Sequence, residues 1–134
     1  MNSVQRRHHV AYQLNYHLVL LPKYRKKVLS YPINDYLLEF IYKVCSNNEY
    51  TFLSHEIRPD HVHIFISALP KHSPSQIVRT LKSITARELF KKYPKILAQY
   101  YWEGKYWSNG YYVGTAGAVS SETIKNYIER LDHQ

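Results

Sequence analysis

Two segments of the chain alternate apolar and polar residues with a period of two, and this pattern limits the possible folds more than any other feature. In residues 10–21 the larger apolar side chains occupy every second position, at Tyr12, Leu14, Tyr16, Leu18 and Leu20. Residues 61–68 keep the same spacing with Val62, Ile64 and Ile66. Because side chains alternate across a strand, both segments are predicted to be β-strands with one face on a core and one polar face.

The other segments complete a regular order of elements. In chain order these are a helix over residues 33–47, a strand over 50–57, a helix from Pro74, capped by Ser73, to the residue before Pro94, a strand over 111–115, and a final helix capped by Ser120. The turn signal Arg58-Pro59-Asp60 predicts a hairpin between the strands over 50–57 and 61–68.

This order, β-α-β-β-α-β followed by a helix, predicts an α+β fold of the ferredoxin-like, RRM-like kind, with one antiparallel sheet and two helices on one face. At 134 residues, the chain has room for one domain over residues 1–134. The additional C-terminal helix needs a surface of its own. We expect it on the other sheet face, against a neighbouring protomer, or both.

The charge balance favours a polyanionic partner. The chain has 18 Lys and Arg against 10 Asp and Glu, a net charge of +8, and its basic residues are spread along its whole length. Many of its 14 tyrosines lie beside Lys or Arg, a combination suited to unpaired bases and phosphates. There is no apolar run long enough for a membrane span and no secretory signal, so a cytoplasmic protein is expected.

The strand over 61–68 contains a candidate metal site. His61 and His63 are two residues apart and therefore share a sheet face, about 6 to 7 Å apart at Cα. Two imidazoles at this separation can converge on one ion about 2 Å from each. The pair alone does not establish a metal site, because half-exposed strand histidines without a metal are the simpler interpretation.

A candidate nucleophile lies on the final helix. Ile124, Ile128 and Leu131 form the predicted buried stripe of this helix, and Tyr127 lies beside it. A phenol has a pKa of about 10 and must lose its proton as it attacks, and a nearby cation or base can assist this loss. An aromatic residue in a core or an interface would occupy the same position.

Two groups of basic residues are candidates for contacts with nucleic acid. The first, Lys23, Arg25, Lys26 and Lys27, follows Pro22 in a loop; the second, Arg79, Lys82 and Arg87, lies on the outer face of the helix from Pro74. A solvated surface is an equal alternative for the helix residues and a weaker one for the loop. Tyr24, Trp107 and Tyr111 could stack on bases, and buried packing is an equal alternative for Trp107.

Four motifs in unbroken order give the chain a family resemblance. They are Tyr16-His17-Leu18-Val19 leading into Pro22 to Leu29, Pro59-Asp60-His61-Val62-His63, Trp107 to Val113, and the segment from Val119 to Ile128. Over nearly its whole length the chain resembles the single-tyrosine (Y1) transposases of the IS200/IS605 group. These belong to the HUH nucleases, named for two histidines that flank a hydrophobic residue.

The resemblance implies a reaction and a set of partners. His61 and His63 would hold a divalent metal, Mg²⁺ or Mn²⁺, and Tyr127 would attack a phosphate of single-stranded DNA at hairpin-containing element ends. The products would be a 5′-phosphotyrosine and a free 3′-hydroxyl, which allow rejoining with no nucleotide cofactor. Family members are homodimers in which the tyrosine helix can complete the partner's site.

One departure from the family pattern concerns the third metal ligand. Family members often place a glutamine one turn after the tyrosine, where this chain has Leu131. Gln134 and Asp132 are the first substitutes to consider; His17 is another candidate, and Asp60 is expected to face away from the pair. The alternative function is a non-catalytic or domesticated module that binds single-stranded nucleic acid. A two-histidine phosphoesterase is disfavoured because it would need a second histidine motif.

Overall fold

In the part of the chain that the structure describes, four strands and two long α-helices follow one another as the sequence predicts, and a short third helix is added. The computed structural model describes residues 13–101 and 103–115. Its elements are β1 (Leu14–Leu20), the 3₁₀ turn η2 (Lys23–Arg25), α1 (Ile33–Asn47), β2 (Thr51–Arg58), β3 (His61–Ala68), α2 (Pro74–Lys92), α3 (Pro94–Ala98) and β4 (Tyr112–Thr115). The predicted final helix, with Tyr127, Asp132 and Gln134, lies outside the described residues.

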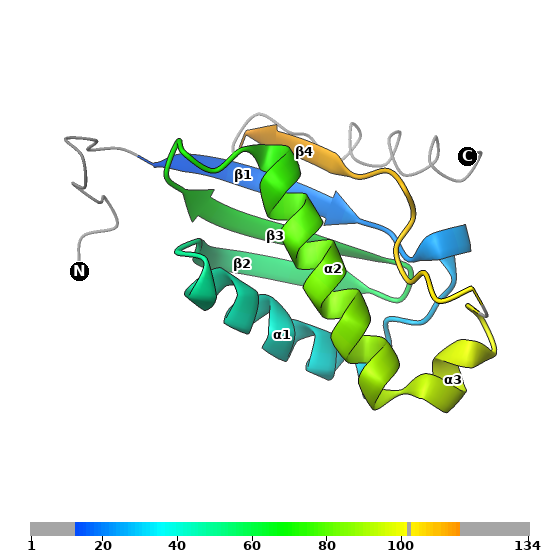
Figure 1. The fold of residues 1–134 in the computed structure, drawn as a ribbon. Coiled ribbons are helices and arrows are strands. Elements are labelled where there is room, and N and C mark those ends of the chain that lie inside the picture. The colour runs from blue at the N-terminus through cyan, green and yellow to red at the C-terminus, as the bar shows by residue number, and fades with distance from the viewer. Residues whose placement is uncertain (1–12, 102, 116–134) are drawn as a thin grey trace.

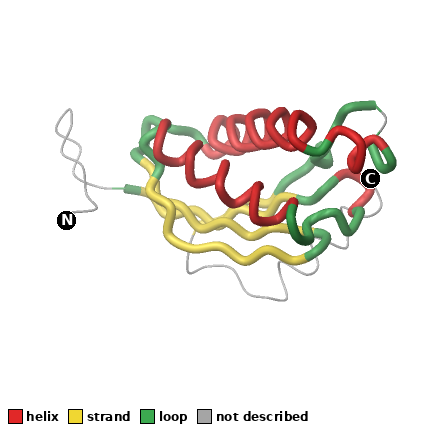
Figure 2. The backbone as a smooth tube through the Cα atoms, turned by 90° about the horizontal axis from the view of Figure 1, so that it is seen from below, coloured by secondary structure: helices red, strands yellow, loops and turns green. Residues whose placement is uncertain are grey.

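The strands form one antiparallel sheet in the order β2-β3-β1-β4. Figure 1 shows β1 and β3 in the middle of this sheet, with α1 and α2 crossing the same face. Seen from below, the helices and the strands form two layers (Figure 2). The predicted ferredoxin-like α+β fold is therefore confirmed for the described part of the chain.

The core lies between the sheet and the two long helices. Leu18 of β1 pairs in register with Ile64 of β3, and both side chains are fully buried. Leu37 of α1 and Leu81 of α2 are also fully buried in this core. The alternation along each strand thus directs the apolar set toward the helices, and each buried side chain contributes about 1.5 to 3 kcal/mol of transfer free energy.

The helix boundaries follow local signals in the sequence. The Ser73 hydroxyl accepts a hydrogen bond from the Gln76 amide at 3.2 Å and caps α2, which starts at Pro74 as predicted. Pro94 follows the end of α2 and also begins α3, because proline fits the first turn of a helix. The sequence did not predict this short helix. Within the described ranges, no helix is long and apolar enough to cross a membrane.

Candidate active site

The sheet face opposite the helices carries polar side chains from the two central strands. His17 of β1 and Ser67 of β3 both belong to this face and are only 3% and 4% exposed. His61 and His63 lie on the same face at the start of β3, as the strand alternation predicts, and their ring centroids are 5.0 Å apart. The polar groups that can carry chemistry are therefore gathered on one side of the sheet.

His63 is held by a buried histidine that the sequence offered only as a possible metal ligand. The Nε2 atom of His17 lies 3.0 Å from Nδ1 of His63, in hydrogen-bonding contact. The His17 ring is itself stacked on Phe65, with centroids 4.2 Å apart and planes 9° from parallel. Its Nε2 therefore points at His63 and is not available to a shared metal ion.

Burial keeps both of these histidines neutral. Burial, together with the nearby charges of His61 and His17, lowers the pKa of His63 to about 4. Burial also lowers the pKa of His17. At pH 7 the His63 imidazole is thus in the uncharged form that a metal requires of a histidine ligand.

His61 is held by a carboxylate. Its Nδ1 atom lies 2.8 Å from Oδ1 of Asp60, and the second oxygen of Asp60 accepts a hydrogen bond from Nε of Arg25 at 2.7 Å. Burial alone would raise the pKa of Asp60, but hydrogen bonds from Arg25 and His61, with their charges, outweigh it and hold the pKa below its usual value. Asp60 is therefore a carboxylate at neutral pH.

The expectation that Asp60 faces away from the histidine pair is wrong. Strand alternation does not apply to it, because Asp60 belongs to the turn that precedes β3. From that turn its carboxylate reaches the neighbouring His61 ring.

The donor set of the pair fits a divalent metal ion. Both Nδ1 atoms are engaged, by His17 and by Asp60, so the Nε2 atoms are the ones left for coordination. Among residues 13–101 and 103–115, no group of three or more His, Cys, Asp or Glu side chains is arranged to hold a metal. A third protein ligand would have to come from another part of the chain or from another residue type.

The predicted basic loop is close to the pair. Lys26 and Lys27 are exposed, whereas Lys23 forms an ion pair with Glu103 at 3.7 Å. Tyr24 and Arg25 have positive φ angles of 60° and 50°, a left-handed backbone that is costly for residues with a Cβ. Figure 1 shows this turn beyond the end of β1, and Arg25 connects it to Asp60.

The backbone of this loop is fixed by hydrogen bonds to Tyr101 and Tyr106. The Lys23 amide donates to the Tyr106 carbonyl at 2.7 Å, and the Tyr101 hydroxyl donates to the Lys23 carbonyl at 2.9 Å. The exposed Tyr24 donates from its hydroxyl to Glu103 at 3.0 Å. These bonds hold the strained turn in place, so its basic side chains start from a defined backbone.

The three basic residues of α2 that were predicted to contact DNA divide into two kinds. Arg79 and Arg87 are exposed, but Lys82 extends toward the turn before β4, where its ammonium donates to the Ser108 carbonyl at 2.8 Å and the Gly110 carbonyl at 3.0 Å. Burial lowers the pKa of Lys82 to about 8. From the sequence, Lys82 was predicted to contact DNA. Its bonds to the 108–110 turn could not be predicted from the helical pattern.

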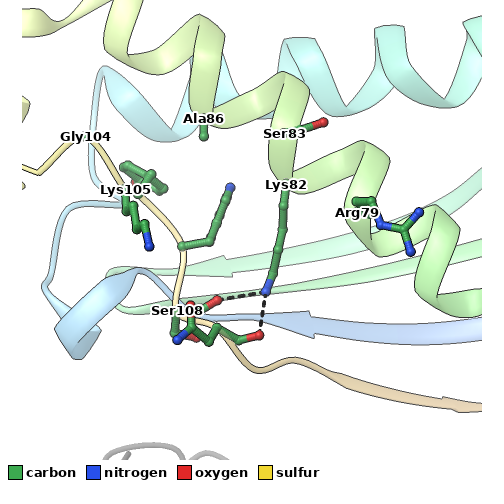
Figure 3. A pocket seen from close by; sticks show the side chains of 10 residues that line it. Arg79, Lys82, Ser83, Ala86, Gly104, Lys105 and Ser108 are labelled. Carbon is green, nitrogen blue, oxygen red and sulfur yellow. Dashed lines mark hydrogen bonds between the residues drawn. The ribbon is translucent and has the colours of Figure 1, made fainter.

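Lys82 borders a pocket of about 360 Å³ between α2 and the segment 104–109. Figure 3 shows Arg79, Lys82 and Lys105 around this pocket, with dashed lines joining Lys82 to the 108–109 backbone. Trp107 also lines it, but this indole is 6% exposed and donates to the buried Thr85 hydroxyl at 3.0 Å. Buried packing is thus the role that the structure gives Trp107, while Tyr24 remains exposed.

Comparison with known proteins gives consistent matches. The family described as "Transposase IS200 like" matches residues 10–131. The ISDra2 transposase TnpA of Deinococcus radiodurans is 35% identical over 119 residues, which cover 89% of this chain and 84% of that protein. The transposase for insertion sequence element IS200 of Salmonella typhimurium is 27% identical over 121 residues, covering 90% and 78% of the two chains.

Two solved structures share the fold. A crystal structure of a candidate transposase from Deinococcus radiodurans R1 superposes with a TM-score of 0.86 at 31% identity, over 95% of this chain and 97% of that one. A tyrosine transposase bound to a REP hairpin superposes with a TM-score of 0.54 at 14% identity, over 89% and 62% of the two chains. The second match concerns the fold alone.

Proposed function

The chain belongs to the IS200-like transposase family, and on that premise we propose that it cuts and rejoins single-stranded DNA with a tyrosine nucleophile and a divalent metal. The observation that carries this proposal is the histidine pair of β3. His61 and His63 share one sheet face, and each has its Nδ1 atom engaged, so two Nε2 atoms are left for one ion.

His61 and His63 are the proposed metal ligands, for Mg²⁺ or Mn²⁺. An ion bound there would supply a Lewis acid that polarises a non-bridging oxygen of the scissile phosphate. For the third ligand we propose Gln134 or Asp132, because Leu131 has no coordinating atom. His17 drops out of this set, since its Nε2 atom lies against His63.

Tyr127 is the proposed nucleophile. Its phenolic oxygen would bond to phosphorus and lose its proton to solvent or a nearby base, while the bond from phosphorus to the 3′-oxygen breaks and that oxygen takes up a proton. The products would be a 5′-phosphotyrosine and a free 3′-hydroxyl. Attack by a 3′-hydroxyl on the phosphotyrosine would reverse the exchange and rejoin the strand, without a nucleotide cofactor.

DNA would approach along the basic loop and the exposed cations of α2. Lys26 and Lys27, with Arg79 and Arg87, are the side chains proposed to contact phosphates, and affinity should therefore fall steeply with salt. Lys23, Arg25 and Lys82 are also proposed to contact DNA, and their bonds within the protein would in addition hold the loop and the 108–110 turn in place.

The proposed substrate and assembly follow the family. One solved structure of this fold is described as bound to a REP hairpin, and we propose hairpin-containing element ends as the substrate here. A homodimer acting in the cytoplasm is the proposed assembly, in which the helix with Tyr127 can complete the partner's site. The position of Leu131 favours one alternative, a domesticated module that binds such DNA without cutting it.

Replacement of the proposed nucleophile tests the chemistry. We expect Tyr127→Phe to abolish the covalent protein–DNA adduct formed on a single-stranded substrate with Mn²⁺, while DNA binding persists. The adduct is measured as a band on a denaturing gel. Tyr42→Phe, at an exposed tyrosine of α1, is the matched control and should form the adduct normally.

The same assay separates the two functions. Adduct formation by Tyr127→Phe would refute the assignment of the nucleophile. DNA binding without any adduct from the wild-type protein, with or without EDTA, would favour the non-cutting module.

A further inference from the structure

The two histidines proposed to hold metal are alike in one respect: a neighbouring side chain contacts one ring nitrogen of each. Each has its Nδ1 atom in contact with a different residue, Asp60 for His61 and His17 for His63. We propose that Asp60 and His17 are positioning residues that fix both histidines in the Nδ1–H tautomer, with Nε2 unprotonated and aimed at a common point. This inference rests on the metal site of the proposed function.

The Asp60 contact fixes one tautomer by charge. A carboxylate can only accept hydrogen bonds, so the 2.8 Å contact requires a proton on Nδ1 of His61. In the neutral ring this leaves the lone pair on Nε2. A carboxylate at this position also increases the electron density of the imidazole, which strengthens it as a ligand.

Arg25 holds the carboxylate in the orientation that this contact needs. Its Nε donates to one oxygen of Asp60 at 2.7 Å, and the other oxygen faces His61. The Leu29 amide donates to the Pro59 carbonyl at 2.9 Å and anchors the turn that carries Asp60. The basic loop is thus joined to a ligand of the proposed metal site through a single carboxylate.

The His17 contact places a second ring nitrogen against Nδ1 of His63; either ring can donate across it, and the proposed tautomer has the proton on His63. For Nε2 of His63 to keep its lone pair, Nδ1 of His63 must carry the proton and donate it to Nε2 of His17 across 3.0 Å. His17 then has its own proton on Nδ1. Stacking on Phe65 and nearly complete burial hold the His17 ring in the orientation that accepts this bond.

Nitrogen-15 NMR of the metal-free full chain at pH 7.5 tests the tautomers directly, because protonated and unprotonated ring nitrogens differ by tens of ppm. We expect the Nδ1–H form at both His61 and His63. We expect His17→Phe to release His63 into a mixture of tautomers and His17→Gln, whose side-chain oxygen can still accept, to restore the bias. Asp60→Ala and Asp60→Asn form the corresponding pair for His61.

Mn²⁺ titration by calorimetry supplies the second measurement. Loss of a residue that orients a metal ligand typically weakens metal affinity about 10- to 100-fold. We expect this loss in His17→Phe and Asp60→Ala, and a smaller one in His17→Gln and Asp60→Asn. His55→Phe, at an exposed histidine of β2, is the matched control and should bind Mn²⁺ like the wild type.

The outcomes separate this inference from the proposed function. A wild-type protein with the Nε2–H tautomer at either histidine, or variants that keep both the tautomers and the Mn²⁺ affinity, would overturn the inference while the metal site stands. A wild-type protein that binds no Mn²⁺ would overturn the metal site, and the NMR spectra would still decide the tautomers. If His17→Phe does not fold, the wild-type spectrum and the His17→Gln variant decide the question.

Discussion

The two faces of the sheet are built by the same strands and yet are held in different ways. On the face toward the helices, Leu18 and Ile64 pair with each other and are fully buried among apolar side chains. On the opposite face, His17 and Ser67 are just as inaccessible, but both are polar and both make hydrogen bonds. Neighbouring residues of one strand therefore contribute to two different kinds of stability.

The two faces differ in the amino-acid substitutions that they should tolerate. Burial of apolar area has no direction, so the helix-facing side should accept other apolar residues of similar volume. The opposite face depends on particular atoms at hydrogen-bond distance, so the identity of each residue matters there even when little folding free energy depends on it. Two substitutions and one change of pH test this difference between the faces.

The largest effect is expected on the helix-facing side. Ile64→Ala should lower the free energy of unfolding by about 2 to 5 kcal/mol, because it removes buried methyl groups and leaves a cavity in the centre of the core. Urea unfolding followed by tryptophan fluorescence measures the loss. Ile64→Val should cost only about 0.5 to 1.5 kcal/mol. Equal losses in the two variants would argue against a close-packed core at this position.

A pH change should act on the other face. The pKa of His63 is about 4 in the folded protein against 6.5 in a free histidine, so the unfolded chain binds more protons between these values. The free energy of unfolding should therefore fall by about 2 kcal/mol as the pH drops from about 6.5 to 4, after allowance for solvent screening. His17, whose pKa is also lowered, adds to this loss with the same sign.

Urea unfolding in EDTA at pH 7.5, 5.5 and 4.5 measures this dependence. His63→Phe should flatten the curve, whereas Ile64→Val, on the opposite face of the same strand, should lower it without changing its slope. The pKa of Asp60 is below its usual value, so its own contribution is lost only at lower pH than this window. An unchanged slope in His63→Phe would contradict the assignment.

The smallest effect is expected at Ser67. Its hydroxyl donates to the Gln13 side-chain oxygen at 2.8 Å, so Ser67→Ala should cost about 0.5 to 1.5 kcal/mol. Ser54→Ala, at an exposed serine of β2, is the control and should stay within about 0.5 kcal/mol of the wild type. A loss at Ser67 as large as that of Ile64→Ala would remove the contrast between the faces.

The helix-facing side of the sheet could be predicted from the sequence, because the spacing of apolar residues within each segment shows which side chains are buried. The helix over 33–47 has the predicted bounds, and Ser73 and Pro74 begin α2 as expected. The strand from His61 to Ala68 also has its predicted limits. Burial follows spacing along a single segment, so one segment at a time is enough to predict it.

The other face could be predicted only in part, because it depends on contacts between segments. Alternation placed His61 and His63 together, but the contact of His17 with His63 depends on the register between β1 and β3, which no local pattern states. Asp60 was misplaced because it lies in a turn, and the bond from Lys82 to the 108–110 turn was missed because a helical wheel does not show a distant loop.

The central position of β1 also matters while the protein is being made. Of the four strands in the described ranges, β1 leaves the ribosome first, yet its partners are β3, which follows after more than 40 residues, and β4, which follows after more than 90. One edge of β1 therefore stays unpaired until β3 has been synthesised, and the other edge stays unpaired until β4 has been synthesised. The nascent chain is thus expected to be most prone to aggregation, and most dependent on chaperones, before residue 115 emerges.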